Sequence, residues 1–273
     1  MSAFLDPKPN DLPGASCDRI IIPCRLFRMA ENGAIIMEQR NQLYEGKAKI
    51  LYETDDPGLL IQYFKDDASA FNAKKLGHIE SKGIFNNKIS TRLFQEVEAN
   101  GIPTHFVKNL SEREMLVKRV DIIMVEVVLR NVVAGSLAKR MGLEEGKILS
   151  LPIIDLHLKD DALDDPLINE DTVIAFDLAT REELFQMREY TLKINRILIE
   201  FFDSRNIDLI DFKLEFGRSA ADGGKLLLAD EITPDGCRLW EKGTGRKMDK
   251  DRFRRDLGNI KATYAEVERL VTS

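Results

Sequence analysis

The stretch Asp211-Phe-Lys-Leu-Glu-Phe-Gly217, followed by Lys225-Leu-Leu-Leu-Ala-Asp-Glu-Ile232, decides the fold predicted for this chain. Successive side chains of a strand point to opposite faces, so the charged residues of the first stretch share one face and its phenylalanines and leucine share the other. Asp222-Gly223, between the two stretches, is typical of a two-residue type I′ turn. The sequence therefore predicts an antiparallel hairpin with one polar and one apolar face.

The same turn predicts which residues of the hairpin oppose each other. With Asp222-Gly223 at its centre, Glu215 lies opposite Asp230 on one face, and two carboxylates at that distance repel unless a cation lies between them. Mg²⁺ commonly binds one or two carboxylates together with substrate phosphates, so the pair is a candidate magnesium site. Lys213 on the same face could neutralise the pair instead, and a bulge in the loop would change the register. This register also turns Glu231 toward the apolar face, for which the pattern gives no reason.

Composition indicates an ordinary globular protein. The 273 residues are 44% hydrophobic and 32% charged, enough for one large two-lobed domain or two small ones. The formal net charge of −6 disfavours a nucleic-acid-binding module. No apolar run reaches the roughly 18 residues that a transmembrane helix needs. The three cysteines form no CxxC pair, which favours a reducing compartment, and we expect a cytoplasmic location.

The beginning of the chain differs from the rest. Residues 1–36 contain four prolines and show no sustained periodicity, so we interpret them as an N-terminal extension outside the functional core. We expect a nucleotide-binding lobe over residues 37–125 and a metal- and substrate-binding lobe over residues 126–273.

Strand signals come first along the chain and helix signals collect later, which is typical of an α+β protein. Thr180 and Glu183 form a capping box at the start of the longest predicted helix. The elements we expect are a hairpin over 47–64, a helix over 82–100, two strands over 115–129 with a break near 121, a short helix over 137–141, a solvated acidic loop over 160–171, a long helix over 180–205 and a closing helix over 253–271.

Lysines suggest where a nucleotide would bind. Lys47 and Lys49 follow Gly46 on one face of a predicted strand and could supply charge for a triphosphate, although two exposed lysines would look the same. Lys118 stands in an apolar strand, just before the predicted break. It suggests a nucleotide held at a hinge, with the backbone of Met124 facing the base. A lysine reaching out from an edge strand is the alternative.

Arginines and a serine suggest an anion site. Arg130 could bind a carboxylate or phosphate through two parallel hydrogen bonds, and Ser136 is a candidate N-cap whose helix would offer free N–H groups. Arg238 follows the proposed metal strand, while Lys250 and Arg254 are one helical turn apart and could face one phosphate. A capping serine beside a surface arginine, and a solvated helix face, are the alternatives.

Together these phrases resemble the bacterial SAICAR synthetases, and the resemblance covers residues 41 to about 270. Its motifs, in this order, are Leu43-Tyr-Glu-Gly-Lys-Ala-Lys49, Glu126-Val-Val-Leu-Arg-Asn-Val-Val-Ala-Gly-Ser136, Asp211-Phe-Lys-Leu-Glu-Phe-Gly217, Asp230-Glu231 with Pro234-Asp-Gly-Cys-Arg-Leu-Trp240, and Lys247-Met-Asp-Lys-Asp-Arg-Phe-Arg254.

The resemblance implies an α+β, two-lobed fold with an ATP cleft between the lobes, distantly like ATP-grasp enzymes and kinases. It implies a Mg²⁺-dependent ligase, in relatives often a homodimer. ATP phosphorylates the carboxylate of the aminoimidazole ribonucleotide CAIR, and the amine of L-aspartate attacks the acyl phosphate to give SAICAR, ADP and phosphate. Such transfer needs positioning and charge neutralisation more than covalent chemistry from the protein.

The resemblance also implies roles for individual residues. ATP would contact Lys47, Lys49 and Lys118, with Met124 near the adenine, and Mg²⁺ would be held by Glu215 and Asp230. CAIR would be held by Arg130, Ser136, Arg238 and Arg254, with Lys159 and Asp165 near its ring or ribose. The reacting groups would be organised by Lys213 and Asp211, with Arg238 beside them. Asn72 stands where some relatives carry aspartate, which leaves an acidic role there in doubt.

Two other functions fit a nucleotide cleft. A small-molecule kinase would transfer phosphate to a hydroxyl and need no aspartate. A nucleotide sensor would keep the fold without catalysis, but the joint presence of Lys213, Glu215, Asp230 and the arginines counts against it.

Overall fold

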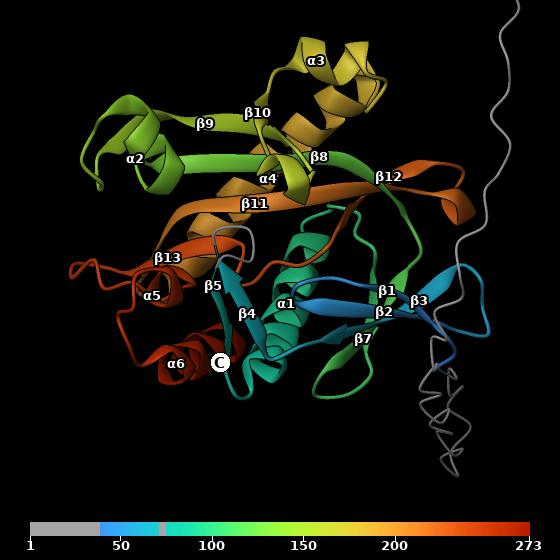
Figure 1. Cartoon of the computed structure of the whole chain (residues 1–273), viewed down its shortest axis with the longest axis horizontal. Coiled ribbons are helices and arrows are strands. Elements are labelled where there is room, and N and C mark those ends of the chain that lie inside the picture. Colours follow the sequence, from blue (N-terminus) through green and yellow to red (C-terminus); the bar gives the residue numbers. More distant parts are fainter. Residues whose placement is uncertain (1–38, 71–74) are drawn as a thin grey trace, which may run out of the picture.

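The computed structural model describes residues 39–70 and 75–273 of the chain. Two large sheets form separate layers with helices packed behind and beside them (Figure 1). In the described part every pair of named strands is antiparallel, as expected for an α+β protein. None of the helices in these ranges is long and apolar enough to cross a membrane. The predicted extension at 1–36 and Asn72 lie outside the described residues.

The first sheet has five strands in the order β1-β2-β3-β7-β6. At its centre is the hairpin predicted around a Pro-Gly turn, with Lys49 of β2 opposite Phe64 of β3. A separate two-stranded sheet, β4-β5, stands beside it. The bounds are β1 (Gln42–Glu45), β2 (Lys49–Glu53), β3 (Leu59–Phe64), β4 (Asp67–Ala70), β5 (Lys75–His78), β6 (Phe106–Asn109) and β7 (Glu114–Lys118).

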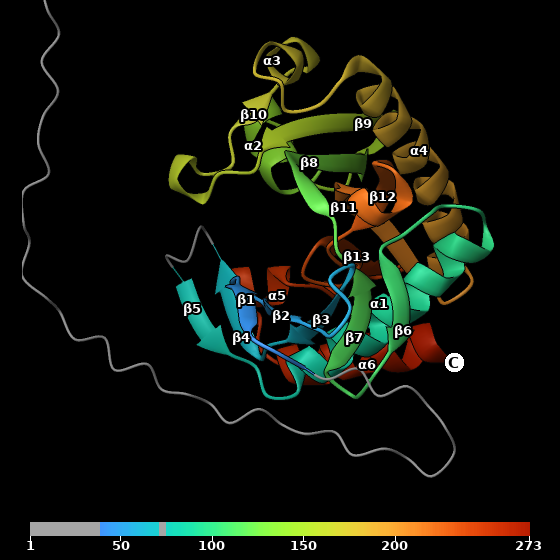
Figure 2. The same cartoon turned by 90° about the vertical axis from the view of Figure 1, so that its right-hand side faces the viewer.

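The second sheet is built on three long strands in the order β9-β8-β11, with shorter strands at its edges. The predicted break near residue 121 is confirmed, because β7 ends at Lys118 and β8 begins at Asp121 and leads into this second layer (Figure 2). The bounds are β8 (Asp121–Val132), β9 (Ile148–Leu158), β10 (Leu167–Ile168), β11 (Ile207–Ser219), β12 (Lys225–Ala229) and β13 (Cys237–Glu241). The lobe boundary we expected between residues 125 and 126 falls inside β8.

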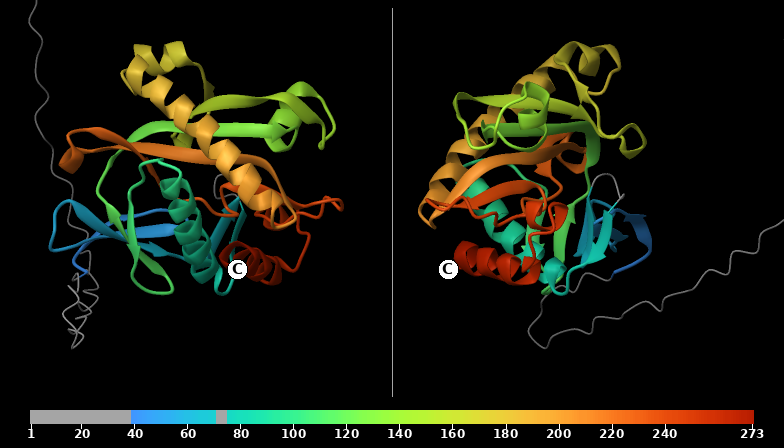
Figure 3. Two further views of the ribbon diagram at one scale, coloured as in Figure 1. Left: turned by 180° about the vertical axis from the view of Figure 1, so that it is seen from behind. Right: turned by 60° about the vertical axis from the view of Figure 1, so that its left-hand side comes forward.

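Helices pack against strands of both sheets. The long helix α4 crosses behind β8 and β11, and α6 packs against α1 below (Figure 3). The predicted capping box is present, since Thr180 and Glu183 bond each other's backbone N–H groups. The bounds are α1 (Lys82–Ala99), α2 (Gly135–Met141), α3 (Glu170–Ala175), α4 (Arg181–Asp203), α5 (Asp251–Arg254) and α6 (Ile260–Thr272).

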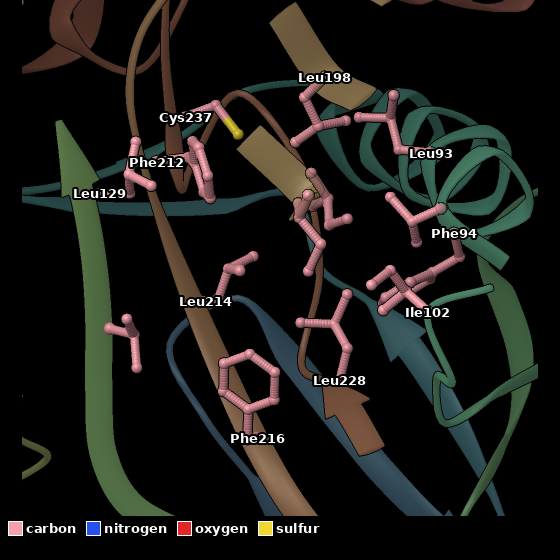
Figure 4. Packing of buried hydrophobic residues seen from close by; sticks show 14 of the residues in the cluster. Leu93, Phe94, Ile102, Leu129, Leu198, Phe212, Leu214, Phe216, Leu228 and Cys237 are labelled. Carbon is pink, nitrogen blue, oxygen red and sulfur yellow. The ribbon is translucent and has the colours of Figure 1, made fainter. Parts of the chain in front are cut away.

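One continuous hydrophobic cluster joins the helices to both sheets (Figure 4). Phe212, Leu214 and Phe216 form the apolar face of β11, and each is at most 1% exposed. They pack with Phe94 of α1 and Leu198 of α4 in the same cluster. Fully burying side chains of this size stabilises the fold by about 1.5–3 kcal/mol each, so the apolar face of β11 holds that strand firmly in place.

The predicted turn between β11 and β12 is wrong. A 3₁₀ turn at Ala220–Asp222 lengthens the connection, and Ser219 lies opposite Lys225. Glu215 is therefore opposite Ala229 and not opposite Asp230. The Asp-Gly pair is not the whole turn but lies within a longer loop, residues 220–224, in which Ser219 Oγ accepts the backbone N–H of Asp222.

Two further predictions on local structure are corrected. The closing helix is split into α5 and α6, because Asp256, Gly258 and Asn259 between them have positive φ angles of 54°, 67° and 52°. A continuous helix does not allow such angles. The acidic segment 160–171 is not wholly a loop, since it contains a 3₁₀ turn and β10, and α3 begins within it.

Asp66 joins α1 to the first sheet. Its carboxylate accepts the backbone N–H groups of Ser81 and Gly83 at 3.1 and 2.8 Å and both Nη atoms of Arg113 at 2.6 and 2.9 Å. Burial alone would raise the pKa of Asp66, but Arg113 and these N–H groups outweigh it and lower the pKa to about 2. A distant carboxylate thus caps a helix that has no side-chain cap of its own.

Replacing Asp66 with asparagine should destabilise the fold. We expect the D66N variant to lose about 2 kcal/mol of unfolding free energy at pH 7 in urea titrations, since it loses charged hydrogen bonds. Because the folded-state pKa lies below the ordinary value, this stabilisation is present above about pH 4 in the wild type and fades as the pH falls toward 2. The matched control is Asp67→Asn, whose half-exposed carboxylate pairs with Lys65 at 2.8 Å and lies 3.9 Å from His78. Equal losses in both variants would contradict the capping role.

Candidate active site

The polar face of the second sheet carries side chains in rows that cross the strands. Glu126 of β8 lies between His157 of β9 and Glu215 of β11. Arg130 of β8 lies opposite Asp211 of β11 in a parallel row. The other face of the same strands belongs to the hydrophobic core, so alternation along each strand places the charged groups together toward the first sheet. The face predicted from the first stretch of sequence is thus present.

A cavity of about 490 Å³ lies between the two sheets. Its apolar lining includes Leu51, Leu60, Val117 and Ile122. The predicted site residues that line it are Lys47, Lys49, Lys118, Met124, Lys159, Asp165, Lys213, Glu215 and Asp230. A cavity with an apolar lining and a few convergent charges is the usual form of a small-molecule site.

Three lysines neutralise Glu215 and Asp230 in this cavity. Glu215 is 3% exposed and accepts Lys159 Nζ at 3.1 Å and Lys213 Nζ. Asp230 pairs with Lys49 and lies 3.8 Å from Lys213 Nζ. Burial would lower the pKa of Lys213, but the carboxylates around it, Glu215 first, outweigh burial and raise that pKa well above its ordinary value. Lys213 therefore carries its charge at physiological pH.

Asp230 reaches this network although it is not opposite Glu215. It follows the last residue of β12 and has a left-handed φ of 63°, which turns its side chain out of the strand alternation. Its backbone carbonyl accepts Gln62 Nε2 at 3.3 Å, which ties the end of β12 to the first sheet. The turn also explains Glu231, which is buried 3.6 Å from Lys49 Nζ rather than on an apolar face. Burial raises the pKa of Glu231, against the lowering effect of Lys49.

A second cavity, of about 330 Å³, adjoins the first. Cationic side chains outnumber carboxylates along its lining. The predicted residues that line it are Lys47, Arg130, Ser136, Asp165, Asp211, Lys213, Arg238 and Arg254. The two cavities share Lys47, Glu126, Asp165 and Lys213. Every predicted site residue thus lines at least one cavity, and Lys213 stands where they meet.

Asp211 holds two arginines of the second cavity. Its Oδ2 accepts Arg130 Nη1 at 3.3 Å and Arg238 Nη1 at 2.7 Å, and the residue is 3% exposed. Arg130 also donates to Ser136 Oγ at 2.9 Å. Ser136 is therefore not the N-cap predicted for α2, which is Ala134, but a partner of Arg130 inside the first helical turn. The arrangement fixes the two guanidinium groups in place.

Arg238 also depends on a glycine. A Cβ atom added to Gly135, whose φ is 53°, would lie 2.3 Å from Arg238 Nη2, so only glycine fits beneath that guanidinium. On its other side Arg238 Nε donates to Asp251 at 3.1 Å, and Asp251 accepts Arg254 Nη1 at 2.7 Å. One buried carboxylate thus positions two cationic groups that line the second cavity.

Two predicted nucleotide contacts differ in detail from expectation. Lys47 lies in the bend between β1 and β2, not in a strand, and pairs with Asp161 at 2.5 Å. Met124 lies within continuous β8 and not at a break, and its backbone carbonyl accepts the N–H of Lys159 at 3.1 Å. Its side chain still lines the first cavity, as does that of Lys118, which pairs with Asp222 at 2.9 Å.

Sequence reasoning missed several polar residues of the site. Glu126 accepts Lys213 Nζ at 2.8 Å, and Asp155 accepts Arg130 Nε at 2.8 Å. Glu126 alternates with valines in an apolar strand, and that pattern could have marked it. His157 and Asp251 line or support the second cavity, but a lone histidine and one acid in a charged run gave no distinguishing signal.

Comparison with known proteins identifies the family. The model of the SAICAR synthetase family matches residues 42–271. The phosphoribosylaminoimidazole-succinocarboxamide synthase of Chlorobaculum parvum is 54% identical over 235 residues, which cover 86% of this chain and 99% of that protein. The enzyme of the same name from Clostridium botulinum is 52% identical over 231 residues, covering 85% and 97%.

Solved structures agree with this result. The crystal structure of phosphoribosylaminoimidazole-succinocarboxamide synthase from Ehrlichia chaffeensis has a TM-score of 0.83 and 45% identity, over 85% of this chain and 98% of that one. A SAICAR synthetase in complex with ADP has a TM-score of 0.81 and 42% identity, over 84% and 97%. Since the family model and these relatives cover nearly all of the described chain, the chain belongs to the SAICAR synthetase family, a family of purine-biosynthesis ligases.

Proposed function

We propose that this protein joins CAIR to L-aspartate at the expense of ATP, giving SAICAR, ADP and phosphate through an acyl phosphate. The observation that carries the proposal is the junction of two chemically different cavities at Lys213. Phosphoryl transfer from a nucleotide to a carboxylate requires the two substrates to meet end to end, with positive charge where they meet. The ammonium of Lys213 supplies that charge.

The first cavity suits ATP. Its apolar lining matches an adenine ring, and Lys47, Lys49 and Lys118 supply charge for the phosphates, with Met124 beside the base. The ADP bound by a 42% identical relative supports this placement. A nucleotide cleft between an N-terminal lobe (37–125) and a C-terminal lobe (126–273), distantly like that of ATP-grasp enzymes and kinases, belongs to the same proposal.

Glu215 and Asp230 fit a magnesium ion that arrives with the nucleotide. In the described part of the chain no group of three metal-ligating side chains converges, but Mg²⁺ commonly takes only one or two carboxylates and completes its shell with phosphates and water. When bound, Mg²⁺ would neutralise charge on the phosphates. Lys49 and Lys159 contact these carboxylates in the structure and lie close enough to the cavity to bind phosphate themselves.

The second cavity suits CAIR, which carries a phosphate at one end and a carboxylate at the other. Arg130, Arg238 and Arg254 offer planar donors for these groups, and Ser136 adds a hydroxyl. Lys250 also lines this cavity, and no ion pair to another described residue is found for it. We assign Asp165, which lines both cavities, to the ring or ribose side of CAIR. Lys159 lines only the first cavity, so its contact with CAIR stays a prediction from the resemblance.

Each group of the chain has a limited task in this mechanism. Lys213 holds positive charge at the transferring phosphoryl group, and the arginine cluster orients the acceptor carboxylate toward it. Asp211 holds the guanidinium groups of Arg130 and Arg238 in place. Its task is therefore to position cations and not to transfer protons. We further propose that the protein works in the cytoplasm as a homodimer on these small molecules alone.

Aspartate dependence separates the ligase from a small-molecule kinase or a nucleotide sensor. We expect ADP release in Mg-ATP and CAIR to require L-aspartate and to fall at least about 100-fold in a Glu215→Gln variant, because that substitution removes a buried charge among three lysines. Coupled-enzyme measurement of ADP gives both results.

The matched control for this experiment is Glu266→Gln. Its carboxylate pairs with Arg246 and lines neither cavity, so we expect wild-type turnover. ADP release that ignores aspartate would refute the ligase proposal in favour of a kinase. Tight nucleotide binding without turnover in the wild type would indicate a sensor.

Gly135 offers a test of the CAIR cavity that leaves its charged groups in place. Gly135→Ala should displace Arg238 and raise the KM for CAIR about 10-fold or more, with the KM for ATP little changed. Gly142→Ala is the matched control, because Gly142 also has a positive φ, of 63°, but a Cβ there meets no atom within 4 Å. Both variants should be somewhat destabilised by backbone strain. Equal kinetics in the two variants would argue against the placement of CAIR.

A further inference from the structure

His157 lines the second cavity and has a buried hydrogen-bonding atom without a partner in the described part of the chain. The residue lines that cavity on the β9 side, opposite Glu126 in the sheet register. Its Nε2 atom is buried and has no hydrogen-bond partner among the residues that the structure describes. A buried polar atom without a partner costs free energy, so it marks a position where a ligand atom would restore the missing bond.

The tautomer of the ring follows from its other nitrogen. His157 Nδ1 lies 2.8 Å from the backbone carbonyl oxygen of Asp165. A carbonyl oxygen can only accept, so Nδ1 carries a proton and donates it. In the neutral ring Nε2 is then an acceptor, and the group it lacks is a donor. The anionic phosphate and carboxylate of a ribonucleotide have no proton to donate, so neither of them matches Nε2.

The bond to Asp165 also fixes where the ring points. Asp165 has a left-handed φ of 45°, and its own Oδ1 accepts the backbone N–H of Asp160 at 3.0 Å. Leu167 of β10 pairs with His157 directly beyond this loop. The imidazole is therefore held between a sheet position and a closed loop, and its orientation is set before any ligand binds.

We propose that His157 is a substrate-contacting specificity residue, whose Nε2 accepts a hydrogen bond from an N–H or O–H group of the ribonucleotide. The proposal rests on the assignment of the second cavity to CAIR. Two groups of that substrate are donors of this kind, the exocyclic amine on its ring and the ribose hydroxyls. Both lie between the phosphate and the carboxylate, and the cationic groups that suit those two ends, Arg130, Arg238, Arg254 and Lys250, line the same cavity.

Two substitutions of His157 test the roles of its two ring nitrogens separately. Asparagine can place an N–H near the position of Nδ1 and keep the bond to Asp165, but it cannot reach as far as Nε2. Glutamine can place an oxygen acceptor near Nε2. We expect His157→Asn to raise the KM for CAIR about 10-fold, with kcat and the KM for ATP and for aspartate little changed, since a lost hydrogen bond is worth about a factor of ten. His157→Gln should retain most of the wild-type KM for CAIR.

The controls distinguish the inference about His157 from the assignment of the second cavity to CAIR. Arg238→Met should also raise the KM for CAIR. If Arg238→Met does so and His157→Asn does not, the inference about His157 is overturned while the CAIR cavity stands. If neither changes that KM, the assignment of the cavity itself fails. If both histidine variants raise the KM of every substrate and lower the urea midpoint alike, His157 only supports the loop, and the inference is again overturned.

A substrate analogue identifies the donor. The inhibition constant of an imidazole-carboxylate ribonucleotide without the exocyclic amine should be measured with the wild type and with His157→Asn. If the amine is the donor, the two proteins bind this analogue equally. If a ribose hydroxyl is the donor, the variant still binds it about 10-fold more weakly. Either result supports a contact at Nε2, provided that the variant is impaired toward CAIR itself.

Discussion

Strand β11 must bury an apolar face and a charged face at the same time, and the rest of the molecule is arranged around that requirement. Phe212, Leu214 and Phe216 need a core, which α1, α4 and the neighbouring strands supply. Asp211 and Glu215 are equally buried on the opposite face and need cations, because a buried carboxylate without a partner is strongly destabilising. Arg130 and Arg238 pair with Asp211, and Lys159 and Lys213 pair with Glu215. The cavities lie along this charged face.

Alternation within one strand could be predicted from sequence, because it needs only the backbone geometry of that strand. The polar face of β11, the β2-β3 hairpin and the capping box of α4 all followed from such local rules. The register of β11 against β12 did not follow from them, because Asp222 and Gly223 are typical of a two-residue turn but lie in a longer loop. Asp230 nevertheless joined the predicted network through its positive φ, which no strand pattern could indicate.

The site depends on contacts between residues far apart in the chain, and this limited what the sequence could predict. Glu126 and Lys213 meet because β8 pairs with β11, and His157 joins their row because β9 pairs with β8. A single sequence contains no sign of those pairings. The motifs shared with the SAICAR synthetases compensated for this, because the fold of that family already implies which of their residues lie together. They could not mark His157, whose importance depends on one buried nitrogen and the loop that holds it.

The ion pairs of the first cavity favour a metal–nucleotide complex over a free nucleotide as its ligand. Lys49 and Lys159 are paired with Asp230 and Glu215, so phosphate groups that bind these lysines would leave both carboxylates with Lys213 alone. Breaking a buried pair from one side is costly, because the remaining charge stays desolvated. A ligand that brings anionic phosphates and a divalent cation together replaces both partners at once. On the proposed function, Glu215 and Asp230 therefore disfavour a free nucleotide and favour a complexed one, and their pairing with lysines neutralises them in the unliganded site.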